Sequence, residues 1–210
     1  MESFQWRKIM QNQVATRLLG DFQVESGKVR VSDPCYQPDT WCAKTLENVK
    51  RGKWFAEADI GGLSGWGQRV FALRCYHESV SRPHLMEREV ESNDIGVDSG
   101  QAGVFDHSHF KEDLDAVEFK RQYKEAICPE EPWYSMCCDI TLSKMAGTIP
   151  FGVVSSSGVG DGSYVCEVAR KDGEICLIEV DFGLKEKEDD EDDEEDDEEE
   201  EHQDSSRDGV

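Results

Sequence analysis

Two short loops carry the residues of this chain that are best suited to bind a ligand. Residues 96–101 and residues 158–164 each place an aspartate and a serine among glycines, at the end of an apolar, strand-like run. Glycine lets backbone N–H groups approach a ligand closely, while aspartate supplies an acceptor and serine a hydroxyl. Two such loops brought together can hold a polar small molecule or a cation, so we expect them to be neighbours that share one cavity. The expected ligand-binding residues are Asp33, Asp98, Ser99, Gly100, Gln101, Asp106, Gly160, Asp161, Gly162, Ser163 and Tyr164.

Four aspartates are candidates for a convergent cluster, because each follows or interrupts an apolar strand at a turn. They are Asp33, Asp98, Asp106 and Asp161. Converging carboxylates suit a hard cation such as Mg²⁺ or Ca²⁺, so a divalent cation is the one cofactor that the sequence suggests, with Asp33, Asp98 and Asp161 as its ligands. The alternative is structural, since Asp and Ser beside Gly also form ordinary turns by bonding their own backbone. The structural interpretation is favoured for either loop alone, and binding for the pair.

Cys35 is a candidate nucleophile if a histidine base, His77 or His109, reaches its thiol. A thiol reacts well only when a cationic neighbour or a helix start lowers its pKa, so a half-buried thiol in a tight turn is the favoured alternative. The segment His107-Ser108-His109, if extended, places both imidazoles on one side and predicts a transition-metal pair, although histidines at a surface before a helix are commoner. An enzyme would use Cys35, or Asp98 and Asp161, in catalysis.

Charge is concentrated at the end of the chain. Residues 185–210 hold 17 acidic and 3 basic residues, a net charge of −14, which leaves −9 of the formal −23 for residues 1–184. The carboxylates from Glu188 to Glu201 are unbroken, so we expect a disordered acidic tail after a single globular domain. The favoured interpretation of the tail is a solubilising, repulsive appendage, and the alternative is a docking segment for basic partners. The acidic composition makes nucleic acid an unlikely partner.

Other classes of protein are disfavoured by the absence of their signals. No apolar stretch approaches the roughly 18 to 20 residues that a membrane helix needs, so we expect no membrane partner. The first twelve residues lack the apolar segment of a secretion signal, and the eight cysteines show no disulfide framework, which predicts a cytoplasmic location. The sequence also lacks dinucleotide, phosphate-loop, serine-hydrolase and zinc-protease motifs.

Apolar residues alternate with a period of two along most of the chain, which predicts strands. The expected strands and hairpins lie at 22–31, 54–60, 70–77, 95–105, 134–142, 151–154 and 164–182. The alternation at 134–142 is the clearest, and Asp172-Gly173 suits a tight hairpin turn. Helical spacing occurs from Ser108 to about Ile127. We expect a mainly β (α+β) fold, an antiparallel sandwich or barrel-like sheet of about eight strands with one packed helix.

Three segments in order suggest a family. They are Ser32-Asp33-Pro34-Cys35-Tyr36, the stretch Gly96-Val97-Asp98-Ser99-Gly100 with Gly103-Val104-Phe105-Asp106, and Ser156-Ser157-Gly158 followed by Gly160-Asp161-Gly162-Ser163-Tyr164. In order and spacing, roughly residues 18 to 183 resemble an uncharacterised, mainly bacterial family of small proteins classed as a domain of unknown function. Members usually carry Trp or Tyr in place of Val159 and Pro in place of Val165. The resemblance implies no activity.

The sequence leaves two main hypotheses for the function. The favoured one is an intracellular, noncatalytic binding module, whose two loops form a polar pocket for a small polar ligand or a protein segment. The alternative is a hydrolase, either metal-assisted or dependent on Cys35. Recognition through the acidic tail alone is a third possibility.

Overall fold

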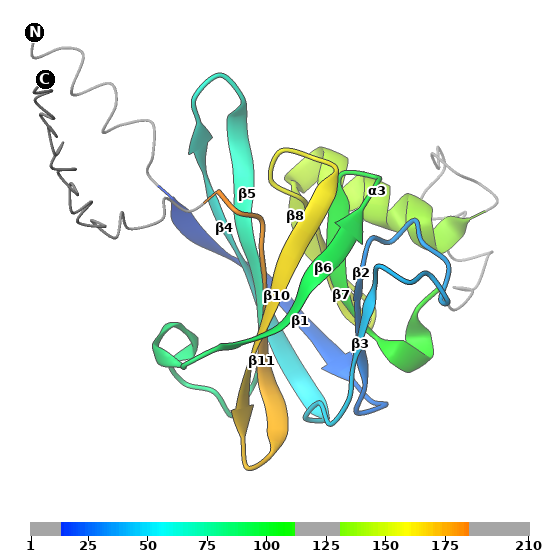
Figure 1. Ribbon diagram of the computed structural model, residues 1–210, viewed down its shortest axis with the longest axis vertical. Helices are drawn as coiled ribbons and strands as arrows, with labels where there is room; N and C mark the ends of the chain where they lie inside the picture. Colours follow the sequence, from blue (N-terminus) through cyan, green and yellow to red (C-terminus); the bar gives the residue numbers. More distant parts are fainter. Residues whose placement is uncertain (1–13, 112–130, 185–210) are drawn as a thin grey trace, which may run out of the picture.

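The computed structural model describes residues 14–111 and 131–184 and shows two antiparallel sheets packed face to face (Figure 1). Sheet A contains, in spatial order, β1 (Ala15–Val24), β4 (Gly52–Leu63), β5 (Gly67–His77), β11 (Glu174–Asp181), β10 (Gly162–Lys171) and β6 (Glu89–Val97). Sheet B contains β3 (Lys44–Leu46), β2 (Val29–Ser32), β7 (Gln101–Asp106), β9 (Gly152–Ser156) and β8 (Ala146–Ile149). The described residues also form the helix α3 (Pro132–Lys144) and the 3₁₀ turns η1 (Pro83–Leu85) and η2 (His107–His109).

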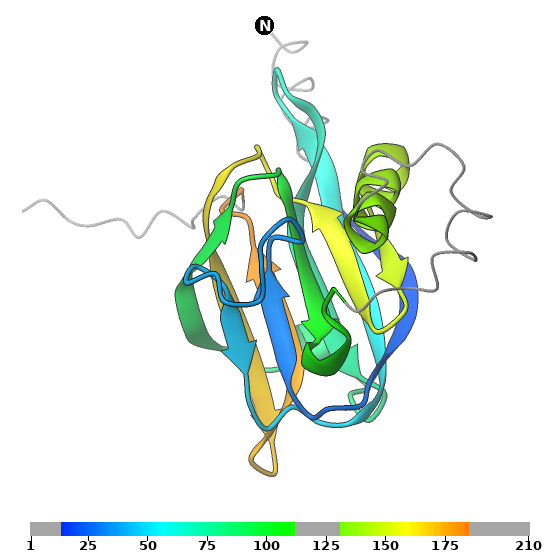
Figure 2. The same cartoon turned by 90° about the vertical axis from the view of Figure 1, so that its right-hand side faces the viewer.

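The expected fold class is confirmed. The described residues form a mainly β sandwich that does not close into a barrel, and α3 packs beside β8 and β9 on the outer face of sheet B (Figure 2). They contain eleven strands, more than the sequence predicted. Among these residues, no helix is long and apolar enough to cross a membrane.

The core lies between the sheets, where alternate residues of each strand point inward. Trp54, Leu73 and Ile178 from sheet A meet Val31 and Val104 from sheet B, and all five side chains are fully buried. This alternation is the pattern from which β4, β5 and β11 were predicted. Burying such side chains contributes about 1.5–3 kcal/mol each, so the inward faces supply most of the driving force for the sandwich.

A second apolar cluster lies on the outer face of sheet B, beneath α3. Phe105 of β7 packs against Phe110 and against Trp133 of α3, with ring centroids 5.5 and 4.9 Å apart. Met136 and Ile149 complete the contact. Because this cluster buries the outer face of β7 as well as its inner face, β7 is covered on both sides and rigidly held.

The last hairpin, β10–β11, forms as predicted. Its two turn residues, Asp172 and Gly173, have φ angles of 55° and 84°. Two successive positive φ angles are typical of the type I′ turn, whose twist matches that of the flanking strands.

The expected hairpin at 22–31 is wrong. β1 and β2 both form, but β1 pairs with β4 in sheet A while β2 pairs with β3 and β7 in sheet B. The chain therefore crosses from one sheet to the other at Ser26-Gly27. The alternation showed where each strand lies, but it carried no information on which strand is its partner.

The expected strand at 134–142 is also wrong, because these residues belong to α3. Its buried residues include Trp133, Met136, Cys137 and Thr141, at spacings of three and four, so a helical stripe was hidden within the alternation. Pro132 occupies the start of the helix, a position that proline favours.

Of the helix expected from Ser108 to about Ile127, only the beginning is described. Residues 107–109 form the 3₁₀ turn η2 instead of an α-helix. Residues 112–130 lie outside the described residues, as do residues 1–13 and the acidic tail at 185–210.

Candidate functional site

The two glycine loops lie side by side, as expected. Strands β6 and β10 pair so that Val97 faces Gly162 and Gly96 faces Ser163. The loop after β6 also accepts a backbone hydrogen bond at the Gly100 carbonyl from the N–H of Ser157, at 3.0 Å. The loops are therefore joined by strand pairing where they border sheet A and by this direct bond where they border sheet B.

Asp33 holds the first loop in place. Its carboxylate is fully buried, and Oδ2 accepts the backbone N–H groups of Asp98 and Ser99 at 2.9 and 2.7 Å. Oδ1 accepts the Ser99 hydroxyl at 2.7 Å and the N–H of Cys35 at 2.8 Å. Four donors occupy the lone pairs that a carboxylate offers, so Asp33 positions the loop and has no oxygen left for a ligand.

Asp106 makes the same arrangement at the opposite end of β7, away from the two loops. Because β2 and β7 are antiparallel, Ser32 lies beside Gly103 and Val29 beside Asp106. The Asp106 carboxylate accepts the backbone N–H groups of Glu25 and Ser26 at 2.6 and 2.9 Å. The expectation that Asp106 joins the other aspartates is therefore wrong.

The Asp106 carboxylate also accepts the N–H and the hydroxyl of Ser108, at 2.9 and 2.6 Å. Burial disfavours its charge, but the bonds from Ser108, Ser26 and Glu25 outweigh burial and lower the pKa of Asp106 below its usual range. Asp33 and Asp106 thus play matching roles, because each ties down a loop where the chain crosses from sheet A to sheet B.

Tyr164 and Ser157 brace the second loop from inside. The Tyr164 hydroxyl lies 2.6 Å from the carbonyl oxygen of Gly160 and 3.2 Å from that of Ser157, and its ring packs edge-on against Phe182. The Ser157 hydroxyl donates to the Gly160 carbonyl at 2.8 Å. Gly160 has a φ of 120°, which explains why glycine is needed here. Tyr164 is therefore a structural support with its hydroxyl turned into the protein.

Gln101 connects the first loop to α3, a contact that sequence reasoning missed because it took 134–142 for a strand. Its side-chain amide donates to the Cys138 sulfur at 3.4 Å and accepts the Thr141 hydroxyl at 3.1 Å. Tyr134, also on α3, lies near Cys138 and Ser99, and burial together with Cys138 raises the pKa of its hydroxyl. Both ends of the Gln101 side-chain amide are therefore bonded to α3, so Gln101 supports the first loop.

The exposed part of the expected site is smaller than the sequence suggested. It consists of Asp98, Val159, Asp161 and Ser163, which we call the loop tip. Asp98 lies near Tyr36, where burial together with Asp98 raises the pKa of the tyrosine hydroxyl, and the Ser163 hydroxyl donates to Asp94 at 3.0 Å. The Asp161 carboxylate has no hydrogen-bond partner among the described residues. Gly100 and Gly160 are half-buried beside the tip, and Gly162 is exposed at its edge.

The three aspartates considered as metal ligands are not gathered into one cluster. Asp33 is buried with its oxygens already bonded, whereas Asp98 and Asp161 are exposed. Across residues 14–111 and 131–184, no group of three or more His, Cys, Asp or Glu side chains is arranged to hold a metal ion.

Cys35 has the opposite environment from a reactive thiol. Burial, reinforced by the neighbouring Asp33, raises the pKa of Cys35 to about 12, and a hydrogen bond involving Ser99 opposes the shift only in part. His77 binds the Ser79 hydroxyl and the Arg51 carbonyl, on sheet A. Neither histidine considered as its base is therefore placed to activate this thiol, since His109 lies at the Asp106 end of β7.

His107 and His109 are not on an extended segment, so the geometry on which their possible metal pairing depended is absent from these residues. They belong to η2, and the His109 ring stacks on Phe151 with centroids 3.7 Å apart. Its Nε2 also lies 3.3 Å from a carboxylate oxygen of Glu25. His109 thus contributes to packing at the Asp106 end of the sandwich.

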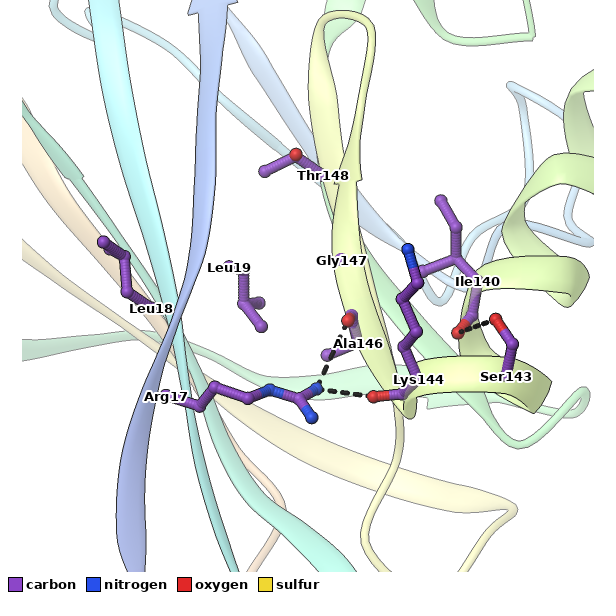
Figure 3. A pocket seen from close by; sticks show the side chains of 9 residues that line it. All are labelled: Arg17, Leu18, Leu19, Ile140, Ser143, Lys144, Ala146, Gly147 and Thr148. Carbon is purple, nitrogen blue, oxygen red and sulfur yellow. Dashed lines mark hydrogen bonds between the residues drawn. The ribbon is translucent and has the colours of Figure 1, made fainter.

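A second surface feature, which the sequence did not predict, is a solvent-open groove between the edge strands β1 and β8 (Figure 3). It has a volume of about 530 Å³. Arg17 reaches across it and donates to the carbonyls of Lys144 and Ala146 at 2.5 and 3.3 Å. Arg17 thereby satisfies carbonyls at the end of α3 and ties the two sheet edges together. Leu18, which is 66% exposed, is an apolar residue of its rim.

Comparisons with known proteins found no matching family model, no matching curated protein and no matching solved structure. The geometry of the two loops and the charges around them are therefore the guide to the function.

Proposed function

We propose that the protein is a noncatalytic binding module whose ligand contacts the loop tip. The observation that carries this proposal is the contrast between a rigid interior and an exposed acidic end. Asp33, Ser157 and Tyr164 fix both loops through buried hydrogen bonds, while the carboxylates of Asp98 and Asp161 face solvent. A surface held in one conformation loses little entropy when a ligand binds.

The chemistry of the loop tip indicates the kind of ligand. Two exposed carboxylates beside the half-exposed Val159 favour a group that offers positive charge or several N–H donors next to apolar carbon. A small polar amine and a basic protein segment both meet this description. Anionic ligands would be repelled at the loop tip, in keeping with the negative charge of the whole chain.

The alternative of a hydrolase receives less support. A thiol with a pKa of about 12 is almost entirely protonated near neutral pH, so Cys35 is a poor nucleophile. A metal-assisted reaction needs convergent ligands, and Asp33 has no oxygen free to be one. Both observations favour binding over catalysis at these loops.

We also propose that the protein works in a reducing compartment such as the cytoplasm. Seven cysteines lie in the described residues and all seven are unpaired, six of them buried. Buried unpaired thiols of this kind are typical of reducing conditions. Membership of the family that the motifs resemble, and a basic partner for residues 185–210, stay proposals on the sequence alone.

Thermal-shift measurements on the full chain test the loop tip. Free arginine, spermidine, nucleotides and divalent cations are the probes, and D98N and D161N are the variants. We expect an amine probe at a hundred times its Kd to raise Tm by about 5–10 °C, the shift that about 2.7 kcal/mol gives in a protein of this size. The double variant should lose this shift.

D139N is the matched control, since Asp139 is exposed on α3 and belongs to neither loop. It removes one negative charge and should keep the full response. If every probe stabilises the wild type and the double variant equally, the loop tip is not the binding surface.

A further inference from the structure

Each sheet carries one buried arginine on its outer face. Arg74 of β5 lies on sheet A and Arg30 of β2 on sheet B, with 4% and 3% of their surfaces exposed. Arg30 faces outward because its neighbours Val29 and Val31 point into the core, while its cross-strand partner is Phe105 of the outer cluster. The two arginines have the same burial but very different surroundings.

Arg74 is surrounded by negative charge. Its guanidinium donates to the carboxylates of Glu179, Glu57 and Asp59 at 2.5, 2.5 and 3.0 Å. Arg88 adds a second cation, 3.2 Å from Glu179. Here a buried charge is balanced in the usual way, by carboxylates that also accept its hydrogen bonds.

Arg30, by contrast, is not paired with a carboxylate of the described residues. Its two Nη atoms donate to the carbonyl oxygens of Pro38 and Gln37 at 2.5 and 3.0 Å, and its carbon Cζ lies 4.8 Å above the ring of Phe110. Its Nε–H is buried and has no acceptor among residues 14–111 and 131–184. Among the described residues, no carboxylate lies within 4.0 Å of this guanidinium. Two of its five N–H groups are therefore used, and both acceptors are uncharged.

The groups near Arg30 do not supply the missing charge. Lys111, the residue after Phe110, has a carboxylate of its own in Glu131, at 3.5 Å. Asp39 influences Arg30 from a distance, but its side chain is exposed in the turn that covers the guanidinium. Among the described residues, Arg30 thus has the electrostatic influence of the exposed Asp39 but no directly bonded carboxylate. A buried cation compensated so weakly destabilises the fold, so its presence calls for a compensating role.

We propose that Arg30 is the anchor of a second binding site, which takes a single oxyanion group, a carboxylate or a phosphate, of a small ligand. This site is separate from the loop tip and favours the opposite charge. The Nε–H and the Nη beside it form one edge of the guanidinium, and an oxyanion binds such an edge with two parallel hydrogen bonds. One of these bonds uses the unpaired Nε–H, and the other replaces a bond to a backbone carbonyl.

The turn at residues 37–39 separates Arg30 from solvent. Gln37 and Pro38, whose carbonyls cover the guanidinium, are both exposed, so Arg30 lies one residue layer below the surface. Phe110 covers one face of the guanidinium plane. An oxyanion that displaces one of these carbonyls reaches the guanidinium in its plane, which is the direction that two parallel hydrogen bonds require.

A titration of the full-length wild type, followed by the NMR signal of the Arg30 Nε–H, tests the site directly. Sodium phosphate and sodium acetate are the probes, against sodium chloride at equal ionic strength. We expect a saturable shift of the Arg30 signal with one of the two oxyanions and little change with chloride, and the effective probe tells phosphate from carboxylate. A signal that stays unmoved with both oxyanions overturns the proposal.

Thermal-shift measurements with variants give an independent readout. R30M keeps the length of the side chain without its charge, and R30K keeps the charge without the planar edge. We expect the saturable stabilisation by the effective oxyanion to disappear in R30M and to need about tenfold more ligand in R30K. Without oxyanion, R30M should be at least as stable as the wild type, because it removes an uncompensated buried charge.

R170M is the matched control, because Arg170 is paired with Glu89 and Glu91 on the surface of sheet A. It should respond to the oxyanion as the wild type does. Equal stabilisation of wild type, R30M and R170M would show a general salt effect and overturn the proposal. The same conclusion follows if R30M fails to fold and the Nε–H signal of the wild type ignores the oxyanions, since Arg30 is then a structural clamp for residues 37–38.

Discussion

The substitution D106N tests whether a buried carboxylate fastens the crossover between β1 and β2. The amide that replaces the carboxylate has one oxygen and one NH₂ group. Whichever way it turns, the NH₂ group faces two donors, either the N–H groups of Glu25 and Ser26 or the N–H and hydroxyl of Ser108. Because each buried donor left without an acceptor costs about 1–3 kcal/mol, we expect D106N to lose about 2–4 kcal/mol of unfolding free energy after partial relaxation.

The same variant makes a prediction about pH. The pKa of Asp106 is lowered in the folded protein, whereas an unfolded aspartate titrates near about 3.9. The charged carboxylate therefore stabilises the fold above this value, and the stabilisation is lost as the pH falls through the folded pKa. The unfolding free energy of the wild type should fall faster than that of D106N below pH 4, by up to about 1.4 kcal/mol per pH unit.

Urea unfolding at pH 7 and at steps between pH 2 and pH 6 measures both effects. The difference between wild type and D106N isolates one carboxylate among the many that titrate in this range. D139N serves as the control, since Asp139 is exposed, and should change stability by less than about 0.5 kcal/mol. A loss below 0.5 kcal/mol in D106N, or parallel pH curves for the two proteins, would refute the role assigned to Asp106.

Two further predictions concern Cys35 and Arg74. Iodoacetamide at pH 7.5 should modify Cys35 in the folded protein roughly three orders of magnitude more slowly than in urea, because a pKa of about 12 leaves little thiolate. Mass spectrometry of the alkylated peptide measures both rates. Equal rates would contradict the environment assigned to this thiol. R74M should lose about 3–5 kcal/mol of unfolding free energy in urea, because it leaves the buried carboxylates of Glu57 and Glu179 without Arg74 as their cationic partner. A loss under 1 kcal/mol would show that this ion-pair network is not coupled to folding.

Local sequence patterns predicted the strands better than their pairing. The alternation in β4 and β5 and the Asp172-Gly173 turn are short-range signals, and each led to the correct element. The crossing between β1 and β2 depends on Asp106, whose bonding partners Glu25 and Ser26 lie about 80 residues earlier in the chain. No local pattern carries such a contact, so the crossing was taken for a hairpin.

The sequence predicted that the two loops lie close together, but not which of their aspartates are buried and which are exposed. The repeated Gly, Asp and Ser correctly indicated that the two loops lie together. The sequence could not show that Asp33 turns inward while Asp98 and Asp161 turn outward, because all three follow apolar runs in the same manner. In α3, alternation and helical spacing coincide over Met136 and Ile140, and only the position of Pro132 favoured the helix.

The matching roles of Asp33 and Asp106 also have a consequence for the rate at which the sandwich unfolds. Their bonds join segments 66 and about 80 residues distant in sequence, so they close large loops and become favourable only after both sheets have assembled. Contacts that form late in folding govern mainly how fast a native protein opens, and much less how fast it forms. We therefore expect the bonds of Asp33 and Asp106 to slow the unfolding of the native protein more than they speed its folding.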